Sequence, residues 1–490
     1  MKYLPTIGLE IHAELRTNTK MFCDCPNNPE EKRPNANTCP ICLGHPGTLP
    51  TINKKAVESV IKVGFAINGE INKQFKFDRK NYFYPDLPKG YQISQYDAPI
   101  VKGGSVNISM RLAEPKIVEL NRVHLEEDAG KLVHSSTSAG SGQQATLVDF
   151  NRGGVPLMEL VTEPNMHSAK EAVAFAKELQ LILRYLGVSD ADLERGQMRV
   201  DANISLGING KLGVKAEIKN LNSFRAIEEA INYEIKRQED ILESGERVRQ
   251  ETLGFDDIRK KTVSQRSKEE AQDYRYFPEP DLPSLDGSGF DMATLKLEVP
   301  ELPQEKRLRF MGQFRLSEEQ AGIIIEDRKG AGYFEEAVSE LEADTDEEIT
   351  LKKTQLLFNY LNSDLKGLMK ERVAEFGGIK ITPENFADLM EMIFKNEINS
   401  RVAKNLLIKM ADSGVDPRTI VENEGLGQIS GEDALMEIAN KIMSANPVAV
   451  ADFKKGKLNA LQFLVGKAMA ELKGRGNPAV LKSLFDKLLK

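Results

Sequence analysis

Four segments of the chain alternate between apolar and polar residues, with a period of two that predicts β-strands. They cover residues 7–14, 118–128, 199–206 and 214–219. In each segment the apolar residues fall on one face of the predicted strand, and ionisable or amide residues fall on the other. The polar faces carry Glu10 and His12; Arg122, His124 and Glu126; Arg199, Asp201 and Asn203; and Lys215, Glu217 and Lys219.

Three further segments have apolar residues at helical spacing, namely 53–68, 168–187 and 224–243. In the second, Ser168 is a candidate N-cap and Gly187 ends the pattern. A single sheet with these helices on its apolar side would gather the polar residues on one open surface. Charged strand residues usually form only a solvated surface, whereas Asp, Asn and Glu are disfavoured inside strands. The pattern by itself therefore leaves two interpretations open: a merely solvated surface, or a surface that carries a functional site.

Segment 118–128 ends in a dense group of ionisable residues, because Glu126, Glu127 and Asp128 follow one another. Burying an unpaired charge costs several kcal/mol or more, so such groups are expected at a site that is open to water or that binds a metal ion. This strand is therefore the one around which we expect a functional site to form.

The pattern changes around residues 299–303, and from there on only helices are predicted. Thr382 is a candidate N-cap with Pro383 at the first helical position, and the next helix is predicted to begin with Ser400 as its cap and to end at Gly414. The predicted fold class is α+β. A β-sheet domain with a helical layer would occupy residues 1–296, followed by two all-α domains at 297–412 and 413–490.

The chain has 490 residues, of which 40% are hydrophobic and 29% charged, as is ordinary for a soluble protein. No apolar run is long enough to cross a bilayer, and the N-terminus lacks the apolar region of a signal peptide. We therefore expect a cytoplasmic protein with no membrane partner. The net charge of −8 means that a nucleic-acid partner would have to meet a locally basic surface.

Such a basic surface is predicted at the C-terminus. The segment Pro447–Lys490 holds nine Lys or Arg against three Asp or Glu, a local excess of +6. Basic amphipathic helices are often only an exposed surface, and a nucleic-acid phosphate backbone is the alternative partner. The candidate contacts are Lys454, Lys455, Lys457, Lys467, Lys473 and Arg475.

All four cysteines lie within 20 residues, as the pairs Cys23/Cys25 and Cys39/Cys42. Two close pairs separated by a loop are typical of four thiolates around a tetrahedral zinc ion. Reduced cysteines without a metal are the alternative, and a disulfide is disfavoured in the cytosol. Because four thiolates leave no open coordination position, the zinc would be structural.

Residues 76–95 contain two prolines and a glycine, which predict a loop, and basic and aromatic side chains alternate along it. This mixture suits a single-stranded nucleic-acid end, where rings stack on bases and cations meet phosphates. Aromatic residues are usually buried, so a loop whose rings fill the core is the competing interpretation.

Five motifs together resemble the signatures of one family, the B subunit of the glutamyl/aspartyl-tRNA amidotransferase. They are Ile7–His12, Lys76–Gln95, His124–Lys131, Arg199–Ser205 and Asp273–Pro280. The resemblance spans essentially the whole chain. It implies a "cradle" catalytic domain, a helical domain and a tail domain that binds tRNA. The four cysteines match a zinc knuckle found in part of that family, in residues 23–42 here.

The resemblance also implies the reaction and its partners. ATP would phosphorylate the side-chain carboxylate of Glu-tRNA(Gln) or Asp-tRNA(Asn), and ammonia would then attack the acyl phosphate. The ammonia would be released from glutamine by a partner amidase subunit, and a small third subunit would tie the two together. The cofactors implied are ATP as substrate, Mg²⁺ and the structural Zn²⁺.

Phosphoryl transfer needs positioning and charge neutralisation, which the residues of the polar faces can supply. Glu10, His12 and Glu126 are the candidate Mg²⁺ ligands, with Glu127, Asp201 and Glu217 behind them. Because Mg²⁺ prefers oxygen ligands, a histidine leaves room for Mn²⁺ or for His12 outside the first coordination shell. The candidate catalytic residues are Glu126 and three cations. The cations would neutralise the negative charge of the phosphates. These cations are Lys80, Lys89 and Arg199.

Two other classes of function remain open. A metal-dependent phosphotransferase or hydrolase acting on a small molecule would not need the basic tail. A zinc-stapled scaffold that only binds tRNA would not need carboxylates on several strand faces. ATP turnover that requires both a metal and aminoacyl-tRNA would separate all three classes.

Overall fold

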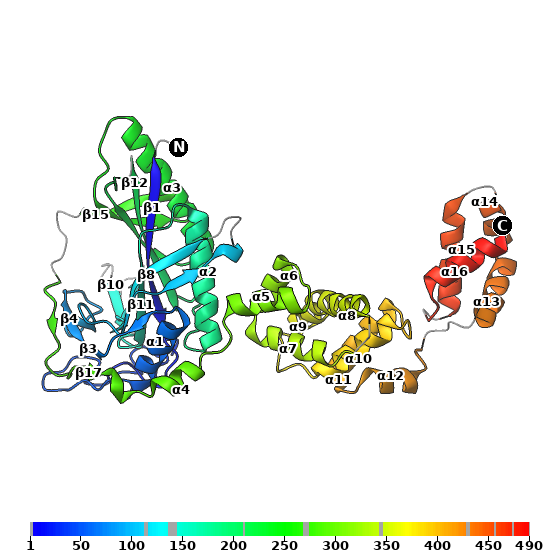
Figure 1. Ribbon diagram of the computed structural model, residues 1–490, viewed down its shortest axis with the longest axis horizontal. Coiled ribbons are helices and arrows are strands. Elements are labelled where there is room, and N and C mark those ends of the chain that lie inside the picture. Colours follow the sequence, from blue (N-terminus) through cyan, green and yellow to red (C-terminus); the bar gives the residue numbers. More distant parts are fainter. Residues whose placement is uncertain are drawn as a thin grey trace. The chain divides into compact units, whose positions relative to one another are not determined.

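The computed structural model describes residues 3–111, 116–135, 145–208, 211–267, 274–342, 346–427, 432–454, 457–472 and 475–489 (Figure 1). The chain divides into two compact units, residues 1–306 and 307–490. The first combines strands and helices, and the second is helical, which confirms the predicted α+β class. The three-domain division with boundaries after residues 296 and 412 stays a prediction.

One large sheet runs through the first unit, and its neighbouring strands pair antiparallel except for β13 and β14. Helix α3 (Phe224–Glu243) makes the crossover between these two parallel strands. The spatial order of the sheet is β15 (Lys261–Ser267), β14 (Glu251–Asp256), β13 (Ala216–Leu221), β12 (Met198–Gly207), β1 (Leu4–Glu14), β11 (Pro156–Thr162), β8 (Ile117–Glu127), β6 (Val101–Lys102) and β2 (Glu70–Ile71), with β7 (Ser105–Asn107) also on β8. All four predicted strands therefore belong to one sheet, as expected.

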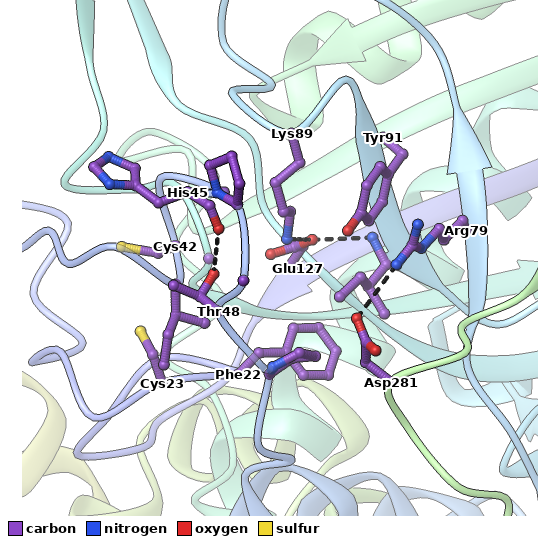
Figure 2. Close-up of a pocket in the computed structure, with 17 residues that line it drawn as sticks. Phe22, Cys23, Cys42, His45, Thr48, Arg79, Lys89, Tyr91, Glu127 and Asp281 are labelled. Carbon is purple, nitrogen blue, oxygen red and sulfur yellow. Dashed lines mark hydrogen bonds and ion pairs between the residues drawn. The ribbon is translucent and has the colours of Figure 1, made fainter.

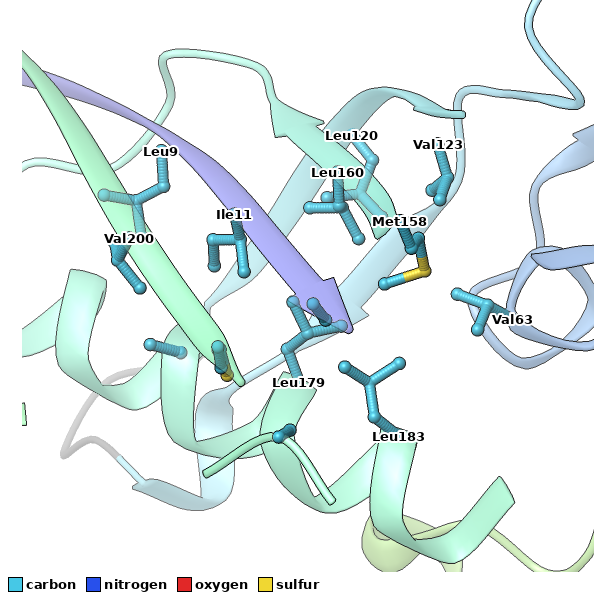
Figure 3. Packing of buried hydrophobic residues seen from close by; sticks show 14 of the residues in the cluster. Leu9, Ile11, Val63, Leu120, Val123, Met158, Leu160, Leu179, Leu183 and Val200 are labelled. Carbon is cyan, nitrogen blue, oxygen red and sulfur yellow. The ribbon is translucent and has the colours of Figure 1, made fainter. Parts of the chain in front are cut away.

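The apolar face of this sheet packs against helices α1 (Lys54–Ala66), α2 (Ala169–Leu186) and α3 (Phe224–Glu243). Figure 3 shows strand residues Leu9, Ile11 and Leu160 facing Leu179 and Leu183 of α2. All five side chains are almost fully buried. Burying a leucine or isoleucine contributes about 1.5–3 kcal/mol, so this layer fixes which face of the sheet is left for polar residues.

The predicted N-caps are correct for two of three helices, and both predicted C-terminal glycines are confirmed. Ser168 caps α2 and accepts a hydrogen bond from the Glu171 amide, and Gly187 ends it in the left-handed conformation, with φ 68°. Thr382 caps α10 (Pro383–Phe394) in the same way. The prediction of Ser400 as a cap was wrong. Asn399 caps α11 (Ser400–Ser413) because its side chain reaches two backbone amides, while Gly414 does end the helix.

The prediction of a loop over residues 76–95 was wrong in part. Strands β4 (Asp78–Asn81) and β5 (Tyr91–Ser94) lie at its two ends and pair with each other, and β16 (Phe277–Pro278) pairs with β4. The prolines and the glycine fall in the turn between β4 and β5, where they do not interrupt the strands. Two further strand pairs are short: β9 (Lys131–Ser135) with β10 (Ala145–Asp149), and β3 (Gln74–Phe75) with β17 (Leu285–Asp286).

The remaining helices begin near the boundary between the units. They are α4 (Met292–Leu297), α5 (Pro303–Gln313), α6 (Glu318–Ile325), α7 (Arg328–Ser339), α8 (Glu347–Tyr360), a π-helical stretch (Leu361–Leu365), α9 (Lys366–Glu371), α10, α11, α12 (Pro417–Glu424), α13 (Glu432–Ala445), α14 (Pro447–Lys454), α15 (Leu458–Glu471) and α16 (Pro478–Leu489). The last four share an apolar cluster of their own around Leu435, Leu464 and Phe485. None of the helices in the described ranges is long and apolar enough to cross a membrane.

Candidate active site and metal centres

Three neighbouring strands place ionisable residues in one row across the centre of the large sheet. His12 on β1 lies directly opposite Glu159 on β11, and Glu159 lies directly opposite His124 on β8. Glu10 lies two residues before His12 on β1 and therefore projects from the same face. Residues that lie opposite each other in a sheet project from the same face, and the other face is filled by the apolar layer. The row therefore lies on the polar face.

The side chains of this row converge on the His12 imidazole. Its Nε2 atom lies 3.4 Å from Glu159 Oε2, 3.6 Å from Glu126 Oε1 and 3.7 Å from Glu10 Oε1. The Nε2 atom of His124 is also 3.4 Å from Glu159 Oε2. Glu126 and Glu159 are almost fully buried. The three candidate metal ligands Glu10, His12 and Glu126 are thus brought together. We call Glu10, His12, His124, Glu126 and Glu159 the acidic cluster.

Glu159 is the member of the acidic cluster that sequence reasoning missed. It lies in the middle of β11, whose sequence Pro-Leu-Met-Glu-Leu-Val-Thr is otherwise almost entirely apolar. A strand in the centre of a sheet, buried on both faces, reads as a continuous apolar run and shows no alternation. The available signal was the single carboxylate inside that run, since a buried charge needs a partner.

Electrostatics place a proton on His12 in the metal-free protein. Burial acts to lower the pKa of His12, but the hydrogen bond and charge of Glu159, with the charges of Glu126 and Glu10, raise it to about 9. Although burial opposes it, the charge of His124 and the hydrogen bond from His12 hold the pKa of Glu159 well below its ordinary value. Burial and the charge of Glu159 raise the pKa of Glu10. Protonated His12 therefore offsets part of the negative charge of the surrounding carboxylates.

The donor set of the acidic cluster fits a divalent cation. Ligand atoms of Glu10, His12 and Glu159 all lie within 4.8 Å of one another, and so do those of His124, Glu126 and Glu159. Three carboxylates suit Mg²⁺, and two imidazoles make Mn²⁺ an equally suitable occupant.

The three less certain candidates are not among the carboxylates that converge on His12. Glu127 projects from the opposite side of β8 to Glu126, forms an ion pair with Lys89 and accepts a hydrogen bond from the Ile93 amide at 3.0 Å. Asp201 lies opposite Glu10 in the sheet. Its carboxylate is 3.3 Å from Lys219 Nζ, which is also 3.4 Å from Glu217.

The three candidate cations differ in their partners. Lys89 is paired with Glu127, and Arg199 donates to Asp128 Oδ2 at 2.9 Å. Among the described residues no carboxylate pairs with Lys80, whose Nζ lies 5.2 Å from the ring centroid of Tyr274. Burial acts to lower the pKa of Lys80, but the charges of Glu126 and Glu159 raise it. Lys80 is thus a cation held near the acidic cluster and available to an anionic ligand.

The four cysteines form a second candidate metal centre. Their sulfur atoms lie within 4.8 Å of one another, and Cys23 and Cys42 are buried. The pKa of the Cys42 thiol is lowered to about 5, chiefly by the hydrogen bond from Cys23, and that bond raises the pKa of Cys23 in return. Four converging sulfurs fit a structural zinc ion, which takes four thiolate ligands in tetrahedral geometry.

A cavity of about 220 Å³ lies beside the cysteine centre (Figure 2), and no residue of the acidic cluster lines it. The cysteine loop forms one wall with Cys42 and His45, and Lys89, Tyr91 and Glu127 form the other. Gly44 has φ +67°, and a Cβ atom there would overlap Lys89, so only glycine fits this wall. The Lys89–Glu127 pair therefore faces this cavity.

The described candidate tRNA contacts lie on helices α14 and α15 or in the segments between the C-terminal helices. Lys454, Lys457 and Lys467 are exposed, although Lys457 is 3.0 Å from Asp452. Arg475 donates to the carbonyl oxygens of Gly425 at 2.7 Å and Leu472 at 3.4 Å. Lys455 and Lys473 lie outside the described residues.

Comparison with known proteins assigns the chain to a protein family. The family described as the GatB/GatE catalytic domain matches residues 5–288, and the family described as the GatB domain matches residues 333–489. The chain belongs to the GatB/GatE family. Both the acidic cluster and the four cysteines fall in the part that matches the catalytic domain of this family, and the basic tail falls in the part that matches the GatB domain.

Full-length relatives support the GatB/GatE assignment and confirm the resemblance found in the sequence. Proteins named as the B subunit of aspartyl/glutamyl-tRNA(Asn/Gln) amidotransferase are 44% identical in Brevibacillus brevis over 490 residues and 44% identical in Thermotoga sp. over 491 residues. Each alignment covers 100% of this chain and 99% of the relative. The protein of that name from Gloeothece citriformis is 42% identical, over 100% of this chain and 98% of its own.

Proposed function

We propose that this chain is the B subunit of a tRNA-dependent amidotransferase and that the acidic cluster is its phosphorylation site. The γ-phosphoryl group of ATP passes to a side-chain carboxylate oxygen of tRNA-borne Glu or Asp, giving ADP and an acyl phosphate. The nitrogen of ammonia then attacks the carbonyl carbon and phosphate leaves. The observation that carries this proposal is the convergence of Glu10, Glu126 and Glu159 on His12, near Lys80.

The residues of the cluster divide the work between them. Glu10, Glu126 and Glu159, with His12 or His124, would hold a divalent cation, which when bound neutralises phosphate charge. Lys80 supplies a positive charge next to the transferring phosphoryl group. Its attraction to the phosphate is stronger in a site that excludes water. Asp128 fixes the guanidinium of Arg199, which therefore approaches a ligand with its remaining N–H groups.

The family supports a multi-subunit assembly with a tRNA substrate. The relatives are named as subunits of an enzyme acting on tRNA(Asn) and tRNA(Gln), so this chain works with other subunits on a tRNA substrate. We place two further proteins in that assembly: an amidase, which releases ammonia from glutamine, and a small third subunit. The cysteine centre holds a zinc ion with a structural role.

The decisive assay measures ATP hydrolysis by the assembled complex with Mg²⁺, adding uncharged tRNA, correctly charged tRNA or mischarged tRNA in turn. We expect turnover only with a mischarged tRNA, because the acceptor carboxylate exists only there. Equal turnover with a free amino acid or another small acceptor would instead identify a small-molecule phosphotransferase. Complete absence of turnover, with tRNA still bound, would identify a scaffold.

The basic tail is proposed to bind tRNA phosphates. Reversing the charge of Lys454, Lys457 and Lys467 together should weaken tRNA binding and make it less dependent on salt. Each lost phosphate contact lowers the slope of log affinity against log salt concentration by about 1. The matched control is reversal of Lys352, an exposed residue of α8 outside the tail. An unchanged slope in the triple variant would show that the tail is only an exposed surface.

A further inference from the structure

Lys20 is a fully buried lysine that is held by carbonyl groups and lies beside a cysteine. Its side chain has an exposed fraction of 0%. The ammonium donates to the carbonyl oxygens of Gly153 at 2.6 Å and Phe150 at 3.1 Å, and its Nζ lies 4.0 Å from Cys42 Sγ. No carboxylate in the described ranges forms an ion pair with it. Carbonyl groups satisfy its hydrogen bonds but do not cancel its charge.

A buried charge needs a counter-charge, because removing an ion from water is costly. Lys353 shows the usual solution in this chain, since its buried ammonium lies 2.8 Å from the buried Glu391 carboxylate. Within the part of the chain that the structure describes, the sulfur of Cys42 is the group beside Lys20 that can carry a negative charge. Four thiolates around one divalent metal carry a net charge of −2, so the cysteine centre supplies the missing charge when it is loaded.

We propose that Lys20 is the counter-charge of a metal held by Cys23, Cys25, Cys39 and Cys42, and that it couples this centre to the turn at residues 150–154. The proposal rests on the structural zinc proposed above. It makes Lys20 a positioning residue, because it acts through the cysteines and the turn and contacts no substrate.

The turn leads from Lys20 to a candidate catalytic residue. The amide of Gly154 donates to the Asp128 carbonyl oxygen at 2.8 Å, and the Gly154 carbonyl accepts from the Met21 amide at 2.8 Å. Arg152 donates to the Ala129 carbonyl oxygen at 3.0 Å. The carboxylate of Asp128 in turn holds Arg199. A continuous set of contacts therefore joins the cysteine centre to the Asp128–Arg199 pair.

Metal affinity tests the charge of Lys20. We expect one zinc per wild-type chain purified without chelator, and chelator competition should give zinc affinities about 10–100-fold lower for Lys20→Gln and Lys20→Met. Lys20→Gln keeps a donor for the two carbonyls but no charge, so it separates charge from hydrogen bonding. The control Lys353→Met removes a buried lysine elsewhere and should leave zinc affinity unchanged. Wild-type affinity in Lys20→Gln would overturn the proposal.

Cobalt substitution adds a spectroscopic test. Removing the neighbouring cation leaves more electron density on the thiolates, so the sulfur-to-cobalt charge-transfer band should move to lower energy in Lys20→Gln. An unmoved band would contradict a direct charge effect of Lys20 on the centre.

Amide hydrogen exchange tests the coupling and needs only the wild-type chain. Removing zinc should speed exchange at Asp128 and Gly154, whose amides are hydrogen-bonded across the turn, and should leave helix α3 unchanged. Unchanged exchange at the turn would overturn the coupling. A chain without zinc would overturn the whole inference, whereas the phosphorylation site is judged separately by ATP turnover with mischarged tRNA.

Discussion

Replacing Glu126 with Gln should lower tRNA-dependent phosphorylation by two to three orders of magnitude. Glutamine keeps the size of the side chain, and it can still accept the hydrogen bond that Ser94 Oγ donates at 3.0 Å. It removes a charge 3.6 Å from His12 Nε2, at the point where the cation ligands converge. Loss of a cation that steadies the phosphates removes several kcal/mol of transition-state stabilisation, or about 10²–10³-fold in rate.

The measurement is ATP hydrolysis dependent on mischarged tRNA, at saturating Mg²⁺, for Glu126→Gln beside the wild type. Glu119→Gln is the matched control, because Glu119 is an exposed carboxylate on the same strand. Affinity for tRNA and glutamine hydrolysis by the assembled complex should be unaffected in both variants. Near-normal ATP turnover in Glu126→Gln would mean that the acidic cluster only lines a surface.

Replacing Glu159 with Gln should cause a loss of similar size and also shift the pH dependence of metal binding. Glu159 lies between two imidazoles and is the largest influence that raises the pKa of His12. In the metal-free wild type that pKa is about 9, so below this pH a cation that binds His12 must displace a proton. Wild-type affinity should therefore rise about tenfold per pH unit and level off near pH 9.

In Glu159→Gln the pKa of His12 falls toward its ordinary value of 6.5, so the rise should end at a lower pH. The stability of the metal-free protein changes in the same window. Because the folded pKa is raised, protonated His12 stabilises the fold fully below about pH 6.5, and this contribution is lost as the pH rises through about 9. Glu159→Gln should lose this dependence.

Mn²⁺ binding followed by calorimetry across the range from the ordinary to the raised pKa of His12, in buffers of different ionisation enthalpy, gives both affinity and proton release. Glu163→Gln is the control, because Glu163 directly follows β11 and contacts Asn121 outside the cluster. Affinity independent of pH in the wild type would show that His12 is not a cation ligand.

Much of the fold was predictable from local patterns. The period of two identified the strands that became β1, β8, β12 and β13, because each has one apolar and one polar face. Helix α3 begins and ends at the predicted residues 224 and 243, and α2 begins directly after its predicted cap. These signals are local, since a cap or an alternation is formed by residues a few positions apart.

The make-up of the site depended on contacts between distant residues. Alternation placed Glu10, His12 and Glu126 on polar faces, but it could not reveal that β11 lies between β1 and β8, because that order is set by the pairing of segments far apart in the sequence. Glu159 therefore went unnoticed inside an apolar run.

The sequence by itself determined the family, the α+β class, the four-cysteine centre and the polar strand faces. Only the tertiary structure decided which charges are paired. It joined Lys89 to Glu127 and Arg199 to Asp128, and it left Lys80 beside the acidic cluster and Lys20 beside the cysteines. The physical reason is that the partner of a charge is fixed by strand register and by burial, and neither follows from the spacing of residues along the chain.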